Sequence, residues 1–236
     1  MGFNVNHKGY GPSKRMPIGI VCDISSSMED VREILNHSLR KLYNIVRETK
    51  NLEKSVDLLV IFYNGEADVR VNLEPVESID IDRLRIDRVT GYTDTGKALL
   101  KALELLNQKK NEYKSNMQDY WQPNLFLITD GYPCAWLGAP DEEYRKVWQS
   151  YQAAAEEIHR LVDNNKLGFV AAGIQRNSGA SANIPKLKEL SNNVVCISED
   201  ISGMTTIKDF IQFITATMMN RETEIVQLMH EAVRGE

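Results

Sequence analysis

Three short segments carry carboxylate and hydroxyl side chains whose spacing allows them to share one ligand. Asp23, Ser25 and Ser27 alternate in the run Asp-Ile-Ser-Ser-Ser. Alternate residues of an extended chain point to the same side, so these three side chains can converge on one point. Thr93 follows in Gly-Tyr-Thr-Asp-Thr-Gly, and Asp130 in Thr-Asp-Gly. Together the segments offer two carboxylates and several hydroxyls.

All of these groups are hard oxygen donors, which indicates the kind of ion they would bind. Such donors favour Mg²⁺, and Mn²⁺ or Ca²⁺ also accept oxygen ligands. Zinc is disfavoured because the three segments contain no His or Cys. The ligand in the second segment stays open, because Thr95 lies two residues after Thr93 and would point the same way in an extended chain.

Apolar patterning predicts the elements that must hold these segments. The expected strands are short apolar or β-branched runs, at residues 18–22, 56–63, 125–128, 168–174 and 194–197, with 67–71 as the second strand of a hairpin around Asn64-Gly65. The expected helices have apolar residues at spacings of three and four, from 28 to 46, 98 to 106, 144 to 162 and 207 to 218. A last helical pattern covers 222–233.

This alternation predicts a doubly wound α/β domain: a mostly parallel sheet with helices on both faces and one antiparallel edge strand. Ligands of such sheets bind at the carboxyl ends of the strands. Asp23 and Asp130 fall just beyond two of those ends. Residues 1–15, with glycines and a proline among polar residues, predict a flexible lead. Residues 16–236 predict a single domain ending in a C-terminal helix.

Composition and charge exclude several classes of partner. A net charge of −5 with scattered basic residues gives no field for nucleic acid. No stretch approaches the roughly 18 apolar residues of a membrane helix, and the start lacks the apolar run of a signal peptide. We therefore expect a cytoplasmic protein with no membrane contact. Three widely spaced cysteines without a CxxC pair predict neither disulfides nor zinc.

The three polar segments together resemble the von Willebrand factor A domain. Its metal-ion-dependent adhesion site has the pattern Asp-x-Ser-x-Ser, then a Thr, then an Asp. The resemblance covers roughly residues 16–218 and implies that Asp130 belongs to the third loop of such a site. It also favours Thr93 as the second-loop ligand, because Thr93 holds the family's first Thr position after the glycine. Thr95 would then cap the helix that begins near Gly96.

Two further segments look like one bacterial group within this family. Residues 125–133 and 209–217 are similar to TerY proteins of tellurium resistance. That group is associated with stress responses to metal oxyanions and with neighbouring kinase and phosphatase partners. The resemblance implies a stress or tellurium-resistance role, with a kinase or phosphatase of the same system as a candidate partner.

The ligand set favours binding over catalysis. Five protein donors leave a near-octahedral ion with an open position, which an Asp or Glu of a protein partner can fill. The resemblance implies that one or both site aspartates reach the ion through water. Metal-assisted hydrolysis would need a base, and no histidine lies in the three segments. Asp94 is the only further carboxylate there. We therefore expect a metal-dependent interaction module and no enzyme.

Two other interpretations of these residues stay open. Asp23 to Ser27 would also suit a plain strand end with a helix N-cap. In the alternative hypothesis of an enzyme, Asp23 would be the nucleophile of a Mg²⁺-dependent phosphotransferase or phosphatase. That class usually carries a second carboxylate two residues later, where this chain has Ser25. Trp136, shortly after Asp130, is either a partner contact or a loop anchor.

Overall fold

Six strands form one sheet in the order β3-β2-β1-β4-β5-β6 in the computed structural model, which describes residues 14–49, 52–177, 181–199 and 204–219. The strands are β1 (Met16–Asp23), β2 (Val56–Tyr63), β3 (Ala67–Pro75), β4 (Asn124–Thr129), β5 (Gly168–Ile174) and β6 (Val194–Ile197). Neighbouring strands are parallel except for β3, which pairs antiparallel with β2 at the edge. The predicted fold class is confirmed.

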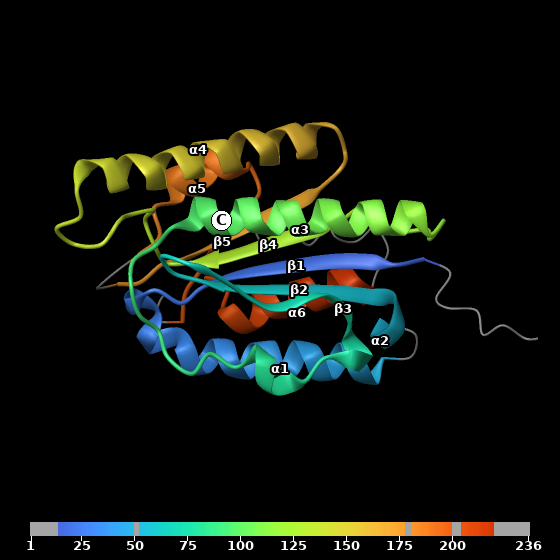
Figure 1. Cartoon of the computed structure of the whole chain (residues 1–236). Helices are drawn as coiled ribbons and strands as arrows, with labels where there is room; N and C mark the ends of the chain where they lie inside the picture. The colour runs from blue at the N-terminus through green and yellow to red at the C-terminus, as the bar shows by residue number, and fades with distance from the viewer. Residues whose placement is uncertain (1–13, 50–51, 178–180, 200–203, 220–236) are drawn as a thin grey trace, which may run out of the picture.

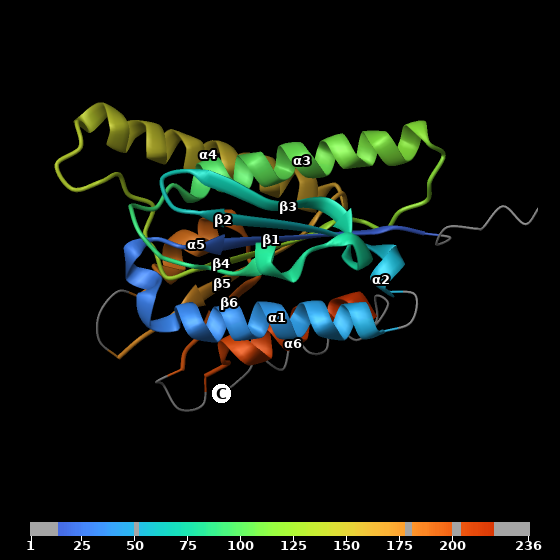
Figure 2. The ribbon, with the colours of Figure 1, turned by 60° about the horizontal axis from the view of Figure 1, so that its bottom comes forward.

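Helices cover both faces of the sheet (Figures 1 and 2). They are α1 (Arg32–Glu48), α2 (Leu52–Ser55), α3 (Thr95–Ser115), α4 (Asp141–Asp163), α5 (Ile184–Leu190) and α6 (Ile207–Met219). Helices α1 and α6 pack on one face, and α3, α4 and α5 pack on the other. Within the described residues, no helix is long and apolar enough to cross a bilayer.

The central strand β1 is buried on both sides, as its unbroken apolar run predicts. Ile18, Ile20 and Cys22 belong to the core beneath α1 and α6, whereas Val21 belongs to the core beneath α3 and α4. The chain winds outward from β1 through β2 to β3, and then from β4 through β5 to β6. The winding direction therefore switches between β1 and β4, which is where an open α/β sheet offers its binding crevice.

The first helix begins differently from the prediction. A 3-10 helix at Ser26–Val31 precedes α1, so the expected α-helix from residue 28 starts four residues later. Main-chain hydrogen bonds from Thr90 to Ile24 and from Ser26 to Gly91 hold this segment against the loop before α3. Such tertiary contacts can favour the tighter turn over a regular helix.

A buried ion pair lies at the end of β1 that is opposite to Asp23. Arg15, just before Met16, donates from Nε to Asp57 Oδ2 at 2.8 Å. Asp57 is fully buried and also accepts the Tyr113 hydroxyl. Most of the predicted N-terminal lead, residues 1–13, and the predicted helix at 222–233 lie outside the described residues.

Candidate metal centre

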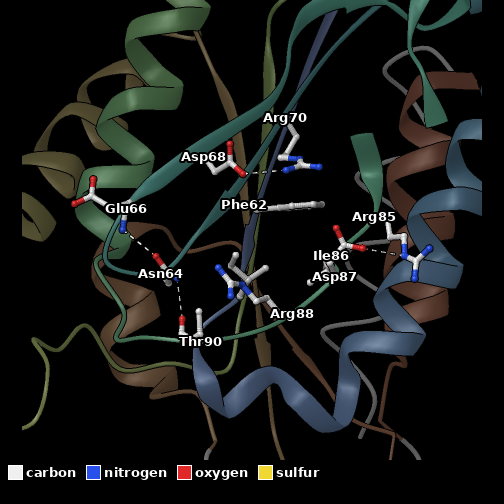
Figure 3. Close-up of a pocket in the computed structure, with 11 residues that line it drawn as sticks. Phe62, Asn64, Glu66, Asp68, Arg70, Arg85, Ile86, Asp87, Arg88 and Thr90 are labelled. Atoms are coloured by element: carbon white, nitrogen blue, oxygen red, sulfur yellow. Dashed lines mark hydrogen bonds and ion pairs between the residues drawn. The ribbon is translucent and has the colours of Figure 1, made fainter. Parts of the chain in front are cut away.

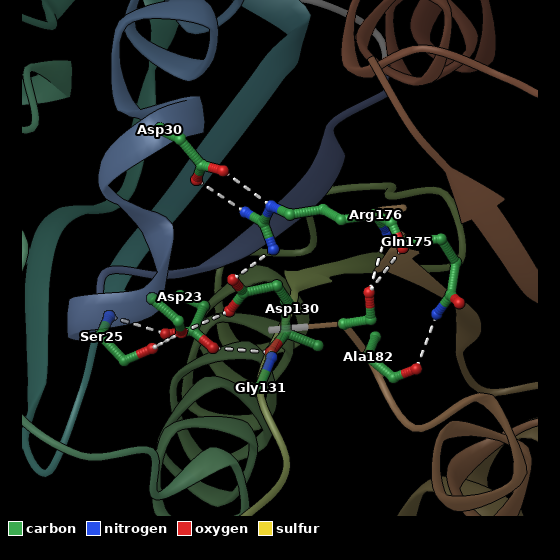
Figure 4. A network of polar contacts seen from close by, with 11 residues as sticks. Asp23, Ser25, Asp30, Asp130, Gly131, Gln175, Arg176 and Ala182 are labelled. Atoms are coloured by element: carbon green, nitrogen blue, oxygen red, sulfur yellow. Dashed lines mark hydrogen bonds and ion pairs between the residues drawn. The ribbon is translucent and has the colours of Figure 1, made fainter. Parts of the chain in front are cut away.

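The first and third predicted loops meet through the serine hydroxyls. Ser27 Oγ donates to Asp130 Oδ1 at 2.8 Å, and Ser25 Oγ lies 3.2 Å from Ser27 Oγ. β1 and β4 are neighbours, with Cys22 paired to Ile128, so both loops leave the same edge of the sheet. Figure 4 shows Ser25 and Asp130 turned toward this shared space.

Asp23 lies at the base of the cluster and is fully buried. Its Oδ1 accepts the Ser25 N–H at 2.8 Å, and its Oδ2 accepts the Thr129 hydroxyl at 2.6 Å. Burial raises the pKa of Asp23 to about 6, the hydrogen bonds from Thr129 and Ser25 oppose the shift, and the charge of Asp130 adds to it. Its hydrogen-bond partners are neutral, so a cation would relieve this buried charge.

Thr93 joins the same cluster from the second loop. A β-carbon added at Gly131 would lie 2.9 Å from Asp23 Oδ2 and 3.1 Å from Thr93 Oγ1, so both oxygens border the space above Gly131. Two main-chain hydrogen bonds between Thr93 and Cys134, of 2.9 and 3.3 Å, fasten this loop to the segment after Asp130. Within the described residues, the Thr93 hydroxyl has no hydrogen-bond partner, so it is available to a ligand.

Thr95 points elsewhere. It is the first residue of α3, and its hydroxyl lies 3.2 Å from that of Tyr63. The expectation that Thr95 caps the helix is wrong, because the helix starts one residue before Gly96 and Asp94 is the cap. Asp94 Oδ1 accepts the Lys97 N–H at 3.0 Å and the Ser150 hydroxyl at 2.8 Å. These contacts tie Asp94 to the helix start and do not support its use as a base.

The cap interpretation of the first loop also fails for its serines. Ser25 occupies the position before the 3-10 helix, but no side-chain hydrogen bond caps that helix. The hydroxyls of Ser25 and Ser27 turn toward each other and toward Asp130 instead. Ser26 turns away, and its hydroxyl donates to the Gly91 carbonyl at 3.2 Å. The alternation predicted for this loop is present.

Ile24, the other alternate residue, lines a separate pocket. Figure 3 shows this pocket from close by. This pocket, of about 310 Å³, is lined by Ile24 and Phe62 together with polar side chains that include Asn64, Arg70 and Arg88. Asn64 donates to the Thr90 carbonyl at 2.8 Å and so ties the end of β2 to the second loop. The pocket therefore flanks the polar cluster without sharing its side chains.

Two residues of the centre, Arg176 and Asp30, were not predicted from the sequence. Arg176 Nη1 donates to Asp130 Oδ2 at 2.7 Å, and its Nε and Nη2 each donate to the Asp30 carboxylate at 2.9 Å (Figure 4). Burial raises the pKa of Asp130, the hydrogen bonds from Ser27 and Arg176 and the charge of Arg176 oppose this shift, and the charge of Asp30 adds to it. Arg176 lies two residues after the end of the predicted strand 168–174, so its place at the carboxyl end of the sheet was a usable signal.

Apolar side chains are exposed beside the polar cluster. Tyr132, Trp136 and Leu137 follow Asp130 within seven positions and are 44%, 42% and 99% exposed. Trp136 contacts Tyr92 of the second loop, with ring centroids 5.4 Å apart. We call Tyr132, Trp136 and Leu137 the apolar rim. Because nearly half of the Trp136 side chain faces solvent, it anchors the loop and also offers a surface.

The donor set fits a hard divalent ion and depends on hydroxyl groups. Nowhere in the described ranges do three or more His, Cys, Asp or Glu side chains cluster closely enough to hold a metal. Asp23 and Asp130 would supply the charge, and Ser25, Ser27 and Thr93 would supply neutral oxygens. Such a set suits Mg²⁺ better than zinc, which prefers nitrogen and sulfur ligands.

Known structures share this fold at low sequence identity. The pilus adhesin SpaC from Lactobacillus rhamnosus GG, in its open conformation, matches with a TM-score of 0.59 and 14% identity, over 92% of this chain and 30% of that one. Proximal thread matrix protein 1 from the mussel byssus matches with a TM-score of 0.54 and 15% identity, over 92% and 46%. This chain therefore spans less than half of either protein.

A second structure of the mussel protein has a zinc-occupied metal-ion-dependent adhesion site and matches with a TM-score of 0.51 and 16% identity, over 88% of this chain and 47% of that one. No curated protein matches the chain in sequence. The family model of the von Willebrand factor type A domain matches residues 18–209, which include all three loops. The chain belongs to the von Willebrand factor type A domain family.

Proposed function

We propose that this protein is a metal-dependent interaction module that uses Mg²⁺ to capture an Asp or Glu side chain of a protein partner. The observation that carries the proposal is the convergence of Asp23, Ser25, Ser27, Thr93 and Asp130 at the winding switch of the sheet. Membership of the family supports the general part of this proposal, that such domains bind partners through a divalent metal.

The chain's own residues prepare this site. The Ser27 hydroxyl already donates its proton to Asp130, so its oxygen can still offer a lone pair to an ion. The Thr129 hydroxyl donates to Oδ2 of Asp23, and the N–H of Gly131 donates to the Thr129 hydroxyl oxygen at 2.9 Å. A bound Mg²⁺ would supply an electrophilic position that attracts a carboxylate. Since only two of the five donors are charged, that position keeps its affinity for an anion.

A protein partner is favoured over a small substrate. The apolar rim stands next to the polar cluster, and exposed apolar side chains of this kind mark protein interfaces. The only further carboxylate of the three segments, Asp94, is tied to the start of α3. No histidine belongs to the loops. Asp30, a further carboxylate at the centre, is paired with Arg176. These groups favour recognition of a partner over metal-assisted hydrolysis.

We further propose the biological setting from the segments that resemble TerY proteins, residues 125–133 and 209–217. They support a bacterial, cytoplasmic role in stress response or tellurium resistance, with a kinase or phosphatase of the same system as the partner. We also propose that residues 16–236 act as one domain. The zinc-occupied site of the mussel protein means that ions other than Mg²⁺ belong in the test.

Calorimetry on the whole chain tests the site directly. Mg²⁺, Mn²⁺, Ca²⁺ and zinc are titrated into the wild type and into Asp23→Ala and Asp130→Ala. We expect Mg²⁺ binding in the wild type and its loss in both variants. A partner recovered from cell extract should be retained with Mg²⁺ and released by EDTA. Unchanged Mg²⁺ affinity in Asp23→Ala would falsify the site.

The phosphotransferase alternative is tested in the same proteins. Incubation with phosphomonoesters and with labelled phosphate donors should give neither turnover nor label on Asp23. Ser25 stands where that class carries a second carboxylate, and its hydroxyl contacts Ser27. Turnover that disappears in Asp23→Ala, or phosphate trapped on Asp23, would overturn the binding-module proposal.

A further inference from the structure

The Arg176 side chain joins two carboxylates across the rim of the candidate metal centre. Its Nη1 lies 2.7 Å from Asp130 Oδ2, and its Nε and Nη2 lie 2.9 Å from the two oxygens of Asp30. The side chain of Arg176 is 8% exposed and that of Asp130 is fully buried. The charge of Asp130 is therefore already balanced by a cation that the protein itself provides.

The position of Arg176 is fixed by the backbone around it. The N–H of Gln175 donates to Ile197 at 2.7 Å, and the N–H of Arg176 donates to the Ser181 hydroxyl at 2.8 Å. These bonds place Arg176 at the end of β5, beside β4, where Gly173 pairs with Thr129. A guanidinium stays protonated at any pH that the protein tolerates, so its positive charge is permanent.

The two aspartates of the centre therefore have different electrostatic surroundings. Asp23 accepts hydrogen bonds only from neutral groups, whereas Asp130 shares one oxygen with Arg176 and the other with Ser27. A divalent ion that uses Asp130, directly or through water, must approach a positive charge in contact with that same carboxylate. Like charges repel, and the repulsion is strong at short range in a partly buried site.

We propose that Arg176 is a resident counter-ion of the metal centre, which stabilises Asp130 in the metal-free protein and lowers the affinity for Mg²⁺. The inference rests on the proposed function, because it concerns the same site. Asp30 completes the arrangement. Its carboxylate is 62% exposed and pairs with the other edge of the guanidinium, so Arg176 keeps this partner when Asp130 binds an ion.

The test compares Arg176→Gln with a variant of equal charge change far from the site. Arg160→Gln serves, because Arg160 lies near the end of α4 and pairs with Glu157. Calorimetry with Mg²⁺ alone should show about tenfold tighter binding in Arg176→Gln, from the loss of a neighbouring positive charge. Arg160→Gln should remain within about twofold of the wild type because solvent and salt screen its remote charge.

Asp30→Asn gives the opposite expectation. It removes a negative charge near the ion and the contact of Asp30 with Arg176, so Mg²⁺ affinity should fall. Thermal unfolding supplies an independent readout. In EDTA, Arg176→Gln should unfold at a lower temperature than the wild type, because Asp130 loses its buried partner. Adding Mg²⁺ should then raise its Tm by more than it raises that of the wild type.

Each outcome decides between the proposals. If the wild type binds Mg²⁺ and Arg176→Gln binds it equally or more weakly, Arg176 positions Asp130 and the counter-ion inference falls alone. If neither the wild type nor Arg176→Gln binds Mg²⁺, both proposals fall. If Arg176→Gln does not fold, Asp30→Asn decides: weaker Mg²⁺ binding supports the inference, and unchanged or tighter binding overturns it.

Discussion

Ser27 Oγ donates a 2.8 Å hydrogen bond to Asp130 Oδ1 and so joins two loops that are 103 positions apart in the sequence. The donors of the candidate centre are thus held together by contacts among the protein's own groups. Thr93 is held in place by its main-chain bonds to Cys134. We therefore expect the loops to assemble without an ion.

Chelation should leave the fold intact. Because the loops are joined by protein contacts, we expect the far-ultraviolet circular dichroism spectrum to be the same in EDTA and in Mg²⁺. The Tm should rise with Mg²⁺ concentration as binding to the folded state requires. A loss of helical signal in EDTA would show that the metal holds the loops together, contrary to this expectation.

Asp23→Asn should abolish Mg²⁺ binding and stabilise the metal-free protein at neutral pH. Burial raises the pKa of Asp23 from its ordinary value of 3.8 to about 6, so the folded state binds this proton more tightly than the unfolded state. The stabilising contribution is present below pH 3.8 and is lost as the pH rises through 6. At pH 7.5 in EDTA, the variant should gain about 2 kcal/mol.

The gain in Asp23→Asn should shrink as the pH falls, because the wild-type carboxyl is then protonated. Denaturant unfolding in EDTA at pH 4.5 and pH 7.5 measures the difference. Equal gains at both pH values would mean that the amide stabilises through packing or hydrogen bonding and that the buried charge is not the cause.

Thr93→Val and Thr95→Val should separate binding from stability. Thr93 faces the space shared with Asp23, so its valine variant should lose Mg²⁺ affinity on the order of tenfold with the loss of an oxygen ligand. Thr95 contacts the Tyr63 hydroxyl, so its variant should keep Mg²⁺ affinity and lose about 1 kcal/mol of stability. Calorimetry and denaturant unfolding report the two effects, and the reverse pattern would make Thr95 the ligand.

Gly131→Ala should fill part of the proposed ion site with a methyl group and add no charge. The added methyl would lie 2.7 Å from Thr93 Cγ2 and 2.9 Å from Asp23 Oδ2, so the ligand oxygens must move and Mg²⁺ affinity should be lost. Gly138→Ala is the control. Its methyl meets nothing within 4 Å, but its φ of 80° disfavours a side chain and should cost about 1 kcal/mol. If Gly131→Ala keeps its Mg²⁺ affinity, the ion does not lie above this glycine.

Trp136→Ser and Leu137→Ser should weaken partner binding and leave Mg²⁺ affinity unchanged, because neither residue is among the proposed metal ligands. Met117→Ser is the matched control, since Met117 is 93% exposed just past the far end of α3. With a partner recovered in the EDTA-sensitive assay, the rim variants should each lose on the order of tenfold in affinity. Equal retention of all three variants would exclude the rim from the interface.

The sequence predicted those features of the site that depend on local pattern. Alternation in the segment from Asp23 to Ser27 and the apolar strand before it are properties of neighbouring residues, so the loop's position and the facing of its side chains followed directly. The same reasoning placed Asp130 at the end of the neighbouring strand. The general rule for alternating strands and helices predicted a mostly parallel sheet with helices on both faces, but it did not predict the order of the strands.

Long-range pairing and element boundaries could not be predicted in this way. Arg176 and Asp30 are 146 positions apart, and neither sits in a recognisable motif. The position of Arg176 after a strand was visible, but its partner was not. The error at Thr95 arose because helix starts are uncertain by one or two residues. The 3-10 helix before α1 depends on contacts with the loop around Gly91, which no local pattern reports.

The central place of β1 has a mechanical consequence. The candidate site lies at one end of this strand and the Arg15–Asp57 ion pair at the other, with β2 and β4 bonded along both sides. If the protein is tethered before residue 14 while a partner pulls at the site, tension runs along β1. The hydrogen bonds to both neighbours are then loaded together in shear, so the strand resists as a unit instead of peeling away bond by bond.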